Sequence, residues 1–233
     1  MKDIYTRNIP AITSDEQELL KNKSVLVVGC GGLGGYAIEY LARLGVGRIT
    51  AVDGDTFSES NLNRQLLSSI ATLGQPKSEV AVDRIHSINP NIEAIAVKEF
   101  FTEDNAARLL DGIDLVIDAL DNVAARFVLE YACEKAGITI IHGAVQGWNM
   151  QVTVAQPGSR TLHSIYKING SEDNVSNDNS LDDKTCLCPT PACCAAIQVA
   201  EALKILVGRE STLSGQILFV DLLTIESYTI PLQ

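Results

Sequence analysis

The 233-residue chain is predicted to fold as a doubly wound α/β domain whose mostly parallel sheet is extended by antiparallel C-terminal strands. Two observations predict this class. Between residues 25 and 144, apolar runs alternate with segments of helical periodicity, the pattern of parallel strands covered by helices on both faces. Beyond residue 147, apolar residues recur with period two, which is typical of antiparallel strands. No repeat or boundary appears, so residues 1–233 are interpreted as one domain.

The parallel part begins after an N-terminal arm and helix over residues 1–23. Within it, residues 11–22 are amphipathic, with Ser14 as the expected N-cap and Gln17 as its capping-box partner. Gly45 and Gly47 end the helix after the first strand. The predicted strands are Val25–Val28, Arg48–Val52, 92–97, Asp114–Ala119 and Thr139–Ala144, and the predicted helices are 33–44, 77–88, 103–110 and 122–136.

The C-terminal part is predicted to contain antiparallel strands at MQVTVAQP and TLHSIYKI. Residues 170–185 are acidic and nearly free of apolar groups, so we expect a flexible crossover loop over residues 170–190. The segment CCAAIQVAEALKILVG predicts a helix ended by Gly208, and QILFVDLL and TIESYTI predict the closing strands.

Composition excludes several classes of protein. The formal net charge of −11 disfavours binding to a nucleic-acid backbone. No apolar run approaches the roughly 18 residues that a membrane helix needs, and the first residues lack the apolar core of a signal peptide. We therefore expect a cytoplasmic protein with reduced cysteines, of which Cys30 and Cys133 lie in apolar patterns and are expected to be buried.

A glycine-rich turn follows the first strand and opens a helix. Gly29, Gly31 and Gly34 fit the pattern G-x-G-x-x-G, in which backbone N–H groups and the helix dipole face a phosphate. Asp53 ends the second strand, where a carboxylate can accept hydrogen bonds from ribose hydroxyls. This arrangement predicts a Rossmann-like nucleotide site, and an NAD-dependent oxidoreductase is its usual interpretation.

The residues after Asp53 favour a different chemistry. Asn61, Arg64 and Gln65 are expected on one face of a short helix, and Lys77 near the start of the next helix. A dehydrogenase needs no arginine and lysine at a third phosphate. Adenylation does, because negative charge builds on the α-phosphate and the leaving pyrophosphate. The cations therefore predict ATP-dependent adenylation, and Arg64→Ala is expected to abolish it while leaving the fold intact.

Five ordered segments make a family resemblance specific. VGCGGLG, AVDGDTFSESNLNRQLL, GQPK, INPN and DLVIDALDN resemble, in order and spacing, the ThiF/MoeB/HesA family of ubiquitin-activating-like adenylyltransferases. The resemblance covers residues 1–160 well and 195–225 more loosely. It implies adenylation of the C-terminal glycine of a ubiquitin-like sulfur carrier ending in Gly-Gly, with ATP and Mg²⁺ as cofactors.

The resemblance also implies roles for single residues. Asp53 would bind the ribose, and Asp121 would hold the magnesium ion. Arg7 would reach into the ATP site of a partner subunit, which implies a homodimer with composite sites. The full set that the resemblance assigns to the ATP site is Gly29, Gly31, Gly32, Gly34, Asp53, Asp55, Asn61, Arg64, Gln65, Lys77, Asp121 and Asn122. Asp121 could alternatively act only as the N-cap of the following helix.

The cysteines depart from the family pattern. The two C-x-x-C pairs that often bind zinc in the family are missing, so no structural zinc is expected. Some relatives take up the acyl group on a cysteine of the crossover loop, and Cys186 or Cys188 lies in the corresponding region. Cys193 and Cys194 lie near a helix N-terminus, which lowers the pKa of a thiol. His142 and His163 are interpreted as isolated structural residues, and Trp148 as a packing residue or part of a substrate channel.

Other functions stay open. The same ATP site could adenylate a peptide carboxylate or an amide-bearing nucleoside, although the acidic composition disfavours a tRNA substrate. The chain could also be an NAD-dependent oxidoreductase, which Arg64 and Lys77 disfavour. It could be a non-catalytic partner subunit, but such subunits of the family usually lose the arginine or the aspartate, and this chain keeps both.

Overall fold

The computed structural model describes residues 4–167 and 185–232 and contains one 8-stranded sheet with the order β3-β2-β1-β4-β5-β6-β7-β8. Strands β1 to β5 pair in parallel, and β6, β7 and β8 continue the sheet in antiparallel fashion. The sequence prediction of a mostly parallel sheet with antiparallel C-terminal strands is therefore confirmed. The strands are β1 Ser24–Val28, β2 Arg48–Val52, β3 Glu93–Val97, β4 Leu115–Asp118, β5 Thr139–Gln146, β6 Asn149–Ala155, β7 Gln216–Asp221 and β8 Glu226–Pro231.

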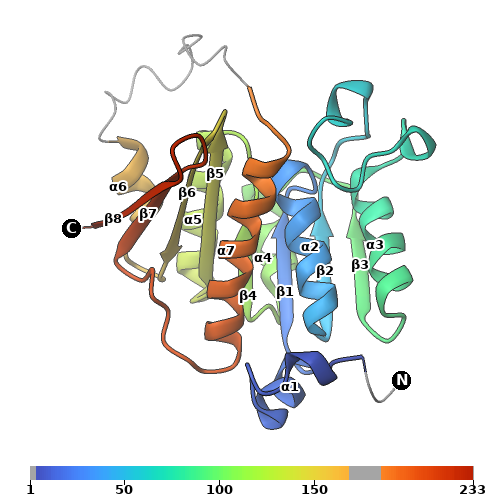
Figure 1. Cartoon of the computed structure of the whole chain (residues 1–233), viewed down its shortest axis with the longest axis horizontal. Helices are drawn as coiled ribbons and strands as arrows, with labels where there is room; N and C mark the ends of the chain where they lie inside the picture. The colour runs from blue at the N-terminus through green and yellow to red at the C-terminus, as the bar shows by residue number, and fades with distance from the viewer. Residues whose placement is uncertain (1–3, 168–184, 233) are drawn as a thin grey trace.

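Helices cover both faces of this sheet (Figure 1). One core packs α2 and α7 against the sheet, and the other lies under α4 and α5. The central strands β1 and β4 are buried along their whole length, as their continuous apolar sequences predict. The helices are α1 Ser14–Leu20, α2 Gly32–Leu44, α3 Lys77–Ile88, α4 Glu103–Leu110, α5 Val123–Ala136, α6 Thr161–Lys167 and α7 Pro189–Leu206, with short 3₁₀ turns η1 Thr6–Asn8, η2 Glu59–Asn61 and η3 Ile70–Thr72.

The first helix begins one residue earlier than its predicted cap implies. Thr13, not Ser14, is the N-cap of α1, and Glu16, not Gln17, completes the capping box. Both residue pairs have the required spacing. Gln17 is instead buried, and its amide donates to the Leu44 carbonyl at 2.8 Å, so tertiary packing selects between the two.

The predicted strand at TLHSIYKI is wrong, because residues 161–167 form helix α6. The Glu130 carboxylate of α5 accepts hydrogen bonds from the Leu162 and His163 N–H groups, at 2.6 and 3.1 Å. These are donors that the first turn of a helix leaves without an internal partner. An acidic side chain distant in the sequence therefore stabilises a helix where local alternation predicts a strand.

Helix α7 is fixed on the sheet by one polar side chain. The Gln198 amide donates to the Asp118 carbonyl of β4 at 2.9 Å and to the Ile141 carbonyl of β5 at 3.1 Å. It fits over Gly143, where an added Cβ would lie 2.5 Å from the Gln198 Cδ. The predicted flexible loop over 170–190 falls largely outside the described residues. No helix within the described ranges is long and apolar enough to cross a membrane.

Candidate active site

The glycine-rich turn, residues 29–34, joins β1 to α2 at the carboxyl edge of the sheet. Two of its glycines are required by the fold. Gly29 has a φ of +96°, and a Cβ on Gly34 would lie 1.8 Å from the Gly29 carbonyl oxygen. Gly32 differs, since a Cβ there would make only ordinary contacts, the nearest at 3.6 Å to Pro191. Packing within the protein would therefore allow a larger residue than glycine at position 32. The absence of a side chain there instead lets a phosphate approach the backbone.

Asp53 connects this turn to the loop after β2. It is buried, and one carboxylate oxygen accepts from the Cys30 N–H at 2.7 Å while the other accepts from the Asp55 N–H at 2.8 Å. A carboxylate can accept about four hydrogen bonds. Asp53 therefore keeps acceptor capacity at the strand end, as a contact to ribose hydroxyls requires.

Lys77 brings a buried positive charge to the same edge. It is the first residue of α3, only 7% exposed, and its Nζ lies 3.1 Å from the exposed carboxylate of Asp55. A buried ammonium needs a negative partner, and Asp55 is one that a phosphate could replace. Sequence and structure agree on the position of Lys77 at the start of this helix.

Asn61, Arg64 and Gln65 lie in hydrogen-bonded turns, not on the predicted short helix. Only Glu59–Asn61 is helical, as the 3₁₀ turn η2, because the Asn61 side chain caps the Ser58 N–H at 3.0 Å and closes a tight turn. The Gln65 N–H still bonds to the Asn61 carbonyl at 2.9 Å, so the three residues stay within one turn of chain.

Two of these side chains cover the glycine-rich turn. The Gln65 amide packs over Gly31, and its buried Oε1 has no hydrogen-bond partner in the described part of the chain. The Arg64 stem packs at Gly32, and its guanidinium donates to the Ser60 carbonyl and to the Asn63 side chain at 2.9 and 2.8 Å. The partly exposed Arg64 guanidinium over bare backbone can donate to a phosphate ester, whereas the unpaired Gln65 Oε1 can only accept, from a hydroxyl or amino group of a ligand.

Asp121 and Asn122 follow β4, beside the glycine-rich turn in the sheet order. Asn122 is the N-cap of α5, accepting from the Ala125 N–H at 2.8 Å, so the alternative that Asp121 caps this helix is wrong. Asp121 is exposed, and one of its carboxylate oxygens accepts from the Asn122 Nδ2 at 3.5 Å. A free carboxylate at a strand end is the kind of oxygen ligand that Mg²⁺ prefers.

Arg7 lies apart from these residues within one chain. It is exposed in η1, in a segment anchored by Tyr5, whose ring packs over Gly45 and whose hydroxyl accepts from Asn89 at 2.6 Å. Gly45 ends α2, so this anchor is at the opposite edge of the sheet from the glycine-rich turn (Figure 1). The structure of one chain does not bring Arg7 to the candidate site.

The crossover cysteines do reach the site. The Asn63 amide donates to the Cys186 carbonyl at 3.1 Å, and the Cys188 Sγ lies 2.9 Å from the Tyr36 hydroxyl. Burial raises the pKa of the Cys186 thiol, while the nearby charge of Arg64 lowers it. The Cys186 thiol therefore lies near Arg64, and the Cys188 thiol lies against Tyr36 of α2.

The two later cysteines do not have the expected lowered pKa. Helix α7 begins at Pro189, so Cys193 and Cys194 lie beyond its first turn. Burial raises the pKa of both thiols, and Cys194 is fully buried. Cys30 and Cys133 are buried, as predicted, and Trp148 is 42% exposed.

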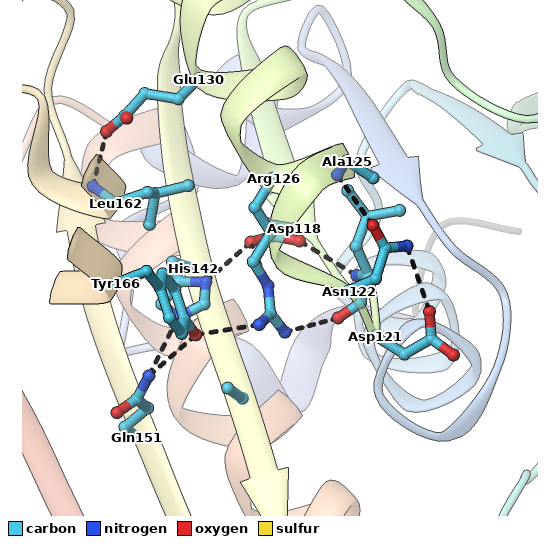
Figure 2. A network of polar contacts seen from close by, with 12 residues as sticks. Asp118, Asp121, Asn122, Ala125, Arg126, Glu130, His142, Gln151, Leu162 and Tyr166 are labelled. Carbon is cyan, nitrogen blue, oxygen red and sulfur yellow. Dashed lines mark hydrogen bonds and ion pairs between the residues drawn. The ribbon is translucent and has the colours of Figure 1, made fainter. Parts of the chain in front are cut away.

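Sequence reasoning missed a buried network behind Asp121, made of Asp118, Arg126, His142, Gln151 and Tyr166 (Figure 2). His142 is not isolated, because its Nδ1 lies 2.7 Å from an Asp118 carboxylate oxygen. His163 is not isolated either, since its ring contacts Glu130 at 2.5 Å. The one sequence signal was Asp118 itself, a charged residue ending an apolar strand.

Burial and hydrogen bonding set the pKa values of His142 and Asp118, and so decide which groups of the network are charged. Burial lowers the pKa of His142, against the opposing effect of Asp118, so the ring is neutral near pH 7. Burial alone would raise the pKa of Asp118, but the His142 hydrogen bond and the Arg126 charge bring it below its usual value. The network thus holds one carboxylate and one guanidinium, whose Nε lies 3.5 Å from the Asp118 carboxylate.

No group of three or more potential metal-ligating side chains occurs within residues 4–167 and 185–232. A magnesium ion would therefore depend on Asp121 together with the phosphates of a nucleotide, which is the usual way that proteins bind this ion.

The sheet order and these strand-end side chains define a doubly wound α/β protein with its site where the strand order reverses, between β1 and β4. Residues 5–233 match the ThiF family, and the chain belongs to it.

Named relatives fall within the same family. Molybdopterin-synthase adenylyltransferase of Escherichia coli K12 is 38% identical over 212 residues, covering 90% of this chain and 83% of the relative. Sulfur carrier protein adenylyltransferase of Thermus thermophilus is 34% identical over 228 residues, covering 95% and 83%. tRNA threonylcarbamoyladenosine dehydratase of Bacillus subtilis is 45% identical over 138 residues, covering 59% and 54%. The E. coli MccB crystal structure shares the fold, with a TM-score of 0.84, 21% identity, and coverage of 100% of this chain and 72% of that one.

Proposed function

We propose that this chain uses ATP to adenylate the C-terminal glycine of a ubiquitin-like sulfur carrier, releasing pyrophosphate. The chain is an adenylyltransferase of the ThiF family. The observation that carries the proposal is the convergence of Arg64 and Lys77 with the glycine-rich turn at the carboxyl edge of the sheet. Relatives named for molybdopterin synthase and sulfur carriers support the choice of substrate.

The chemistry needs positioning and charge neutralisation. The carrier carboxylate forms a bond to the α-phosphorus of ATP, the bond from that phosphorus to the bridging oxygen breaks, and pyrophosphate leaves with the electron pair. Asp53 would hold the ribose, and Asn61, Gln65 and the glycine-rich turn the phosphates. Arg64 and Lys77 would stabilise the charge that develops on the pyrophosphate. Magnesium, held by Asp121, would neutralise further phosphate charge when bound.

The first experiment is calorimetric titration of the protein with Mg-ATP and with NAD. We expect Mg-ATP to bind, and both Asp53→Ala and Arg64→Ala to lose this binding, because each removes a group from the nucleotide site. Carrier-dependent exchange of pyrophosphate into ATP then tests the reaction. Preferential binding of NAD that survives Arg64→Ala would instead assign the chain to the oxidoreductases.

A second substrate class has specific support. The B. subtilis relative named as a tRNA threonylcarbamoyladenosine dehydratase has the higher identity over its shorter match. The same ATP site could adenylate an amide oxygen of a nucleoside, or the carboxylate of a peptide. Pyrophosphate exchange stimulated by a Gly-Gly carrier, but not by tRNA or by a short peptide, supports the sulfur carrier; stimulation by tRNA alone supports the dehydratase.

The proposed enzyme is a cytoplasmic homodimer in which Arg7 of each subunit completes the ATP site of the other. Its support is the exposed position of Arg7 on an anchored segment at the far edge of its own chain. Mixing inactive Arg7→Ala and Arg64→Ala subunits should restore about a quarter of wild-type activity, since half of the dimers are mixed and each has one intact site. No restored activity after verified subunit exchange would exclude composite sites.

Uptake of the acyl group by Cys186 or Cys188 stays a prediction. The support is the proximity of Cys186 to Arg64 and the contact of Cys188 with Tyr36 of α2. If the thiolate of one of them attacks the carbonyl of the adenylate, the bond to the phosphate oxygen breaks and AMP leaves. The carrier is then linked to the protein by a thioester, which added thiols cleave. Separate Cys186→Ser and Cys188→Ser variants, analysed by intact mass spectrometry, would identify the cysteine.

A further inference from the structure

One guanidinium connects Asp121 to a part of the chain that the proposed reaction does not use. Arg126 of α5 donates from one terminal nitrogen to the Leu120 carbonyl at 2.6 Å and from the other to the Tyr166 hydroxyl of α6 at 2.9 Å (Figure 2). Leu120 directly precedes Asp121 in the sequence. The peptide that carries the exposed carboxylate is therefore held from inside the protein.

The donors and acceptors of the network admit one consistent arrangement. The Tyr166 oxygen accepts from Arg126 and from the Gln151 amide, the latter at 3.0 Å, so its own hydrogen points to the His142 Nε2, 3.1 Å away. Nδ1 of a neutral His142 then donates to Asp118 at 2.7 Å. Removing the Tyr166 hydroxyl therefore takes the acceptor from one terminal nitrogen of Arg126 and leaves Gln151 as the remaining neighbour of the His142 Nε2.

Leu120 is held at both ends of its backbone. Its N–H donates to the second Asp118 oxygen at 3.0 Å, and its carbonyl accepts from Arg126 at 2.6 Å. Among residues 4–167 and 185–232, the exposed Asp121 side chain has one hydrogen bond, a long one of 3.5 Å from its neighbour Asn122. The direction of its carboxylate thus depends on the orientation of the Leu120–Asp121 peptide.

We infer that Arg126 and Tyr166 are positioning residues for the Asp121 carboxylate. The inference rests on the proposed function, in which Asp121 holds magnesium. A carboxylate that must meet a metal ion with near-ideal octahedral geometry tolerates little misorientation. Since Glu130 and Arg126 both fix α6 to α5, the position of α6 influences the metal ligand on the other side of α5.

Tyr166→Phe tests this role with the least change in shape. Mn²⁺ binding would be measured by electron paramagnetic resonance in the presence of a non-hydrolysable ATP analogue, alongside carrier-dependent pyrophosphate exchange. We expect about 10-fold weaker Mn²⁺ binding and about 10-fold lower kcat, with the KM for ATP within about 2-fold, as for a misplaced catalytic group. Tyr131→Phe is the matched control, because Tyr131 is exposed on the same helix α5 and outside the network.

Arg126→Lys provides the second variant. A lysine can donate at one position but cannot span Leu120 and Tyr166 together, so it should also weaken Mn²⁺ binding while retaining the positive charge beside Asp118. Wild-type Mn²⁺ affinity and kcat in a folded Tyr166→Phe protein would overturn the inference, and so would an equal loss in Tyr131→Phe. Wild-type protein that binds Mn²⁺ with the nucleotide but shows no exchange with any carrier would contradict the proposed substrate, and the variants would still decide the inference.

Discussion

Polar side chains around the glycine-rich turn differ from those of the buried network in whether they have hydrogen-bond partners within the protein. Around the glycine-rich turn, Arg64 is partly exposed, Gln65 has an unpaired acceptor, and Asp121 faces solvent. In the network, Asp118 and His142 are fully buried and hydrogen-bonded to each other. Groups left without protein partners are available to a ligand, whereas groups that satisfy one another stabilise the fold. Asp118, the last residue of β4, satisfies its partners within the protein, whereas Asp121, three residues later, faces solvent.

The largest expected effect separates these two aspartates by stability. Asp118→Ala removes one partner of a buried charge pair and should lower the free energy of unfolding by about 3–5 kcal/mol. Asp121→Ala changes an exposed side chain and should stay within about 0.5 kcal/mol of wild type while losing activity. Urea denaturation followed by circular dichroism measures both, and equal destabilisation would break the distinction between them.

Arg64 is expected to have the next largest effect, on ATP binding and catalysis but not on stability. Arg64→Ala should reduce pyrophosphate exchange by at least about 10²- to 10³-fold, equivalent to about 3–4 kcal/mol, because one donor to the developing charge is lost. The circular dichroism spectrum should not change. Arg108→Ala is the matched control, because Arg108 pairs with Glu99 on the surface of α4. Near-normal exchange by Arg64→Ala would contradict the assigned role.

Two glycines of the same turn sharpen the comparison further. Gly34→Ala should destabilise the protein by at least about 1–3 kcal/mol, since its Cβ would collide with the Gly29 carbonyl. Gly32→Ala makes no such collision and should keep wild-type stability but weaken Mg-ATP binding. Thermal unfolding and calorimetry on both variants distinguish these outcomes, and unchanged ATP affinity of Gly32→Ala would remove Gly32 from the site.

The smallest expected effect is the pH dependence of stability that His142 contributes. Its folded pKa is lowered by burial, so the unfolded chain binds the proton first as the pH falls below about 6.5. Stability should therefore decrease from about pH 6.5 down through the lowered pKa, by at most about 1.4 kcal/mol per pH unit. His142→Gln should flatten this slope in urea titrations, and His86→Gln, at an exposed imidazole of α3, should not.

The sequence predicted the parallel half of the fold and a candidate site at its carboxyl edge, because both depend on local signals. Arg64 and Lys77 are recognisable from short segments next to the glycine-rich turn. The missed network joins side chains far apart in the chain, such as Arg126 to Tyr166, 40 positions later. Helix α6 was missed for the same reason, since Glu130, which caps it, precedes Leu162 by 32 positions. Periodicity describes neighbours in sequence and contains no information about such partners.

The fit of Gln198 over Gly143 restricts how this protein can change. Any side chain at position 143 would occupy the volume of the Gln198 amide, so the two positions can vary only together, a smaller residue at 198 accompanying a larger one at 143. The same amide bonds to the Asp118 carbonyl at the end of β4 and to the Ile141 carbonyl within β5, so sliding α7 along its axis would break both hydrogen bonds at once. Helix α7 therefore has a single register on the sheet. The first turn of α7, which packs beside Gly32, consequently has a fixed position relative to the glycine-rich turn.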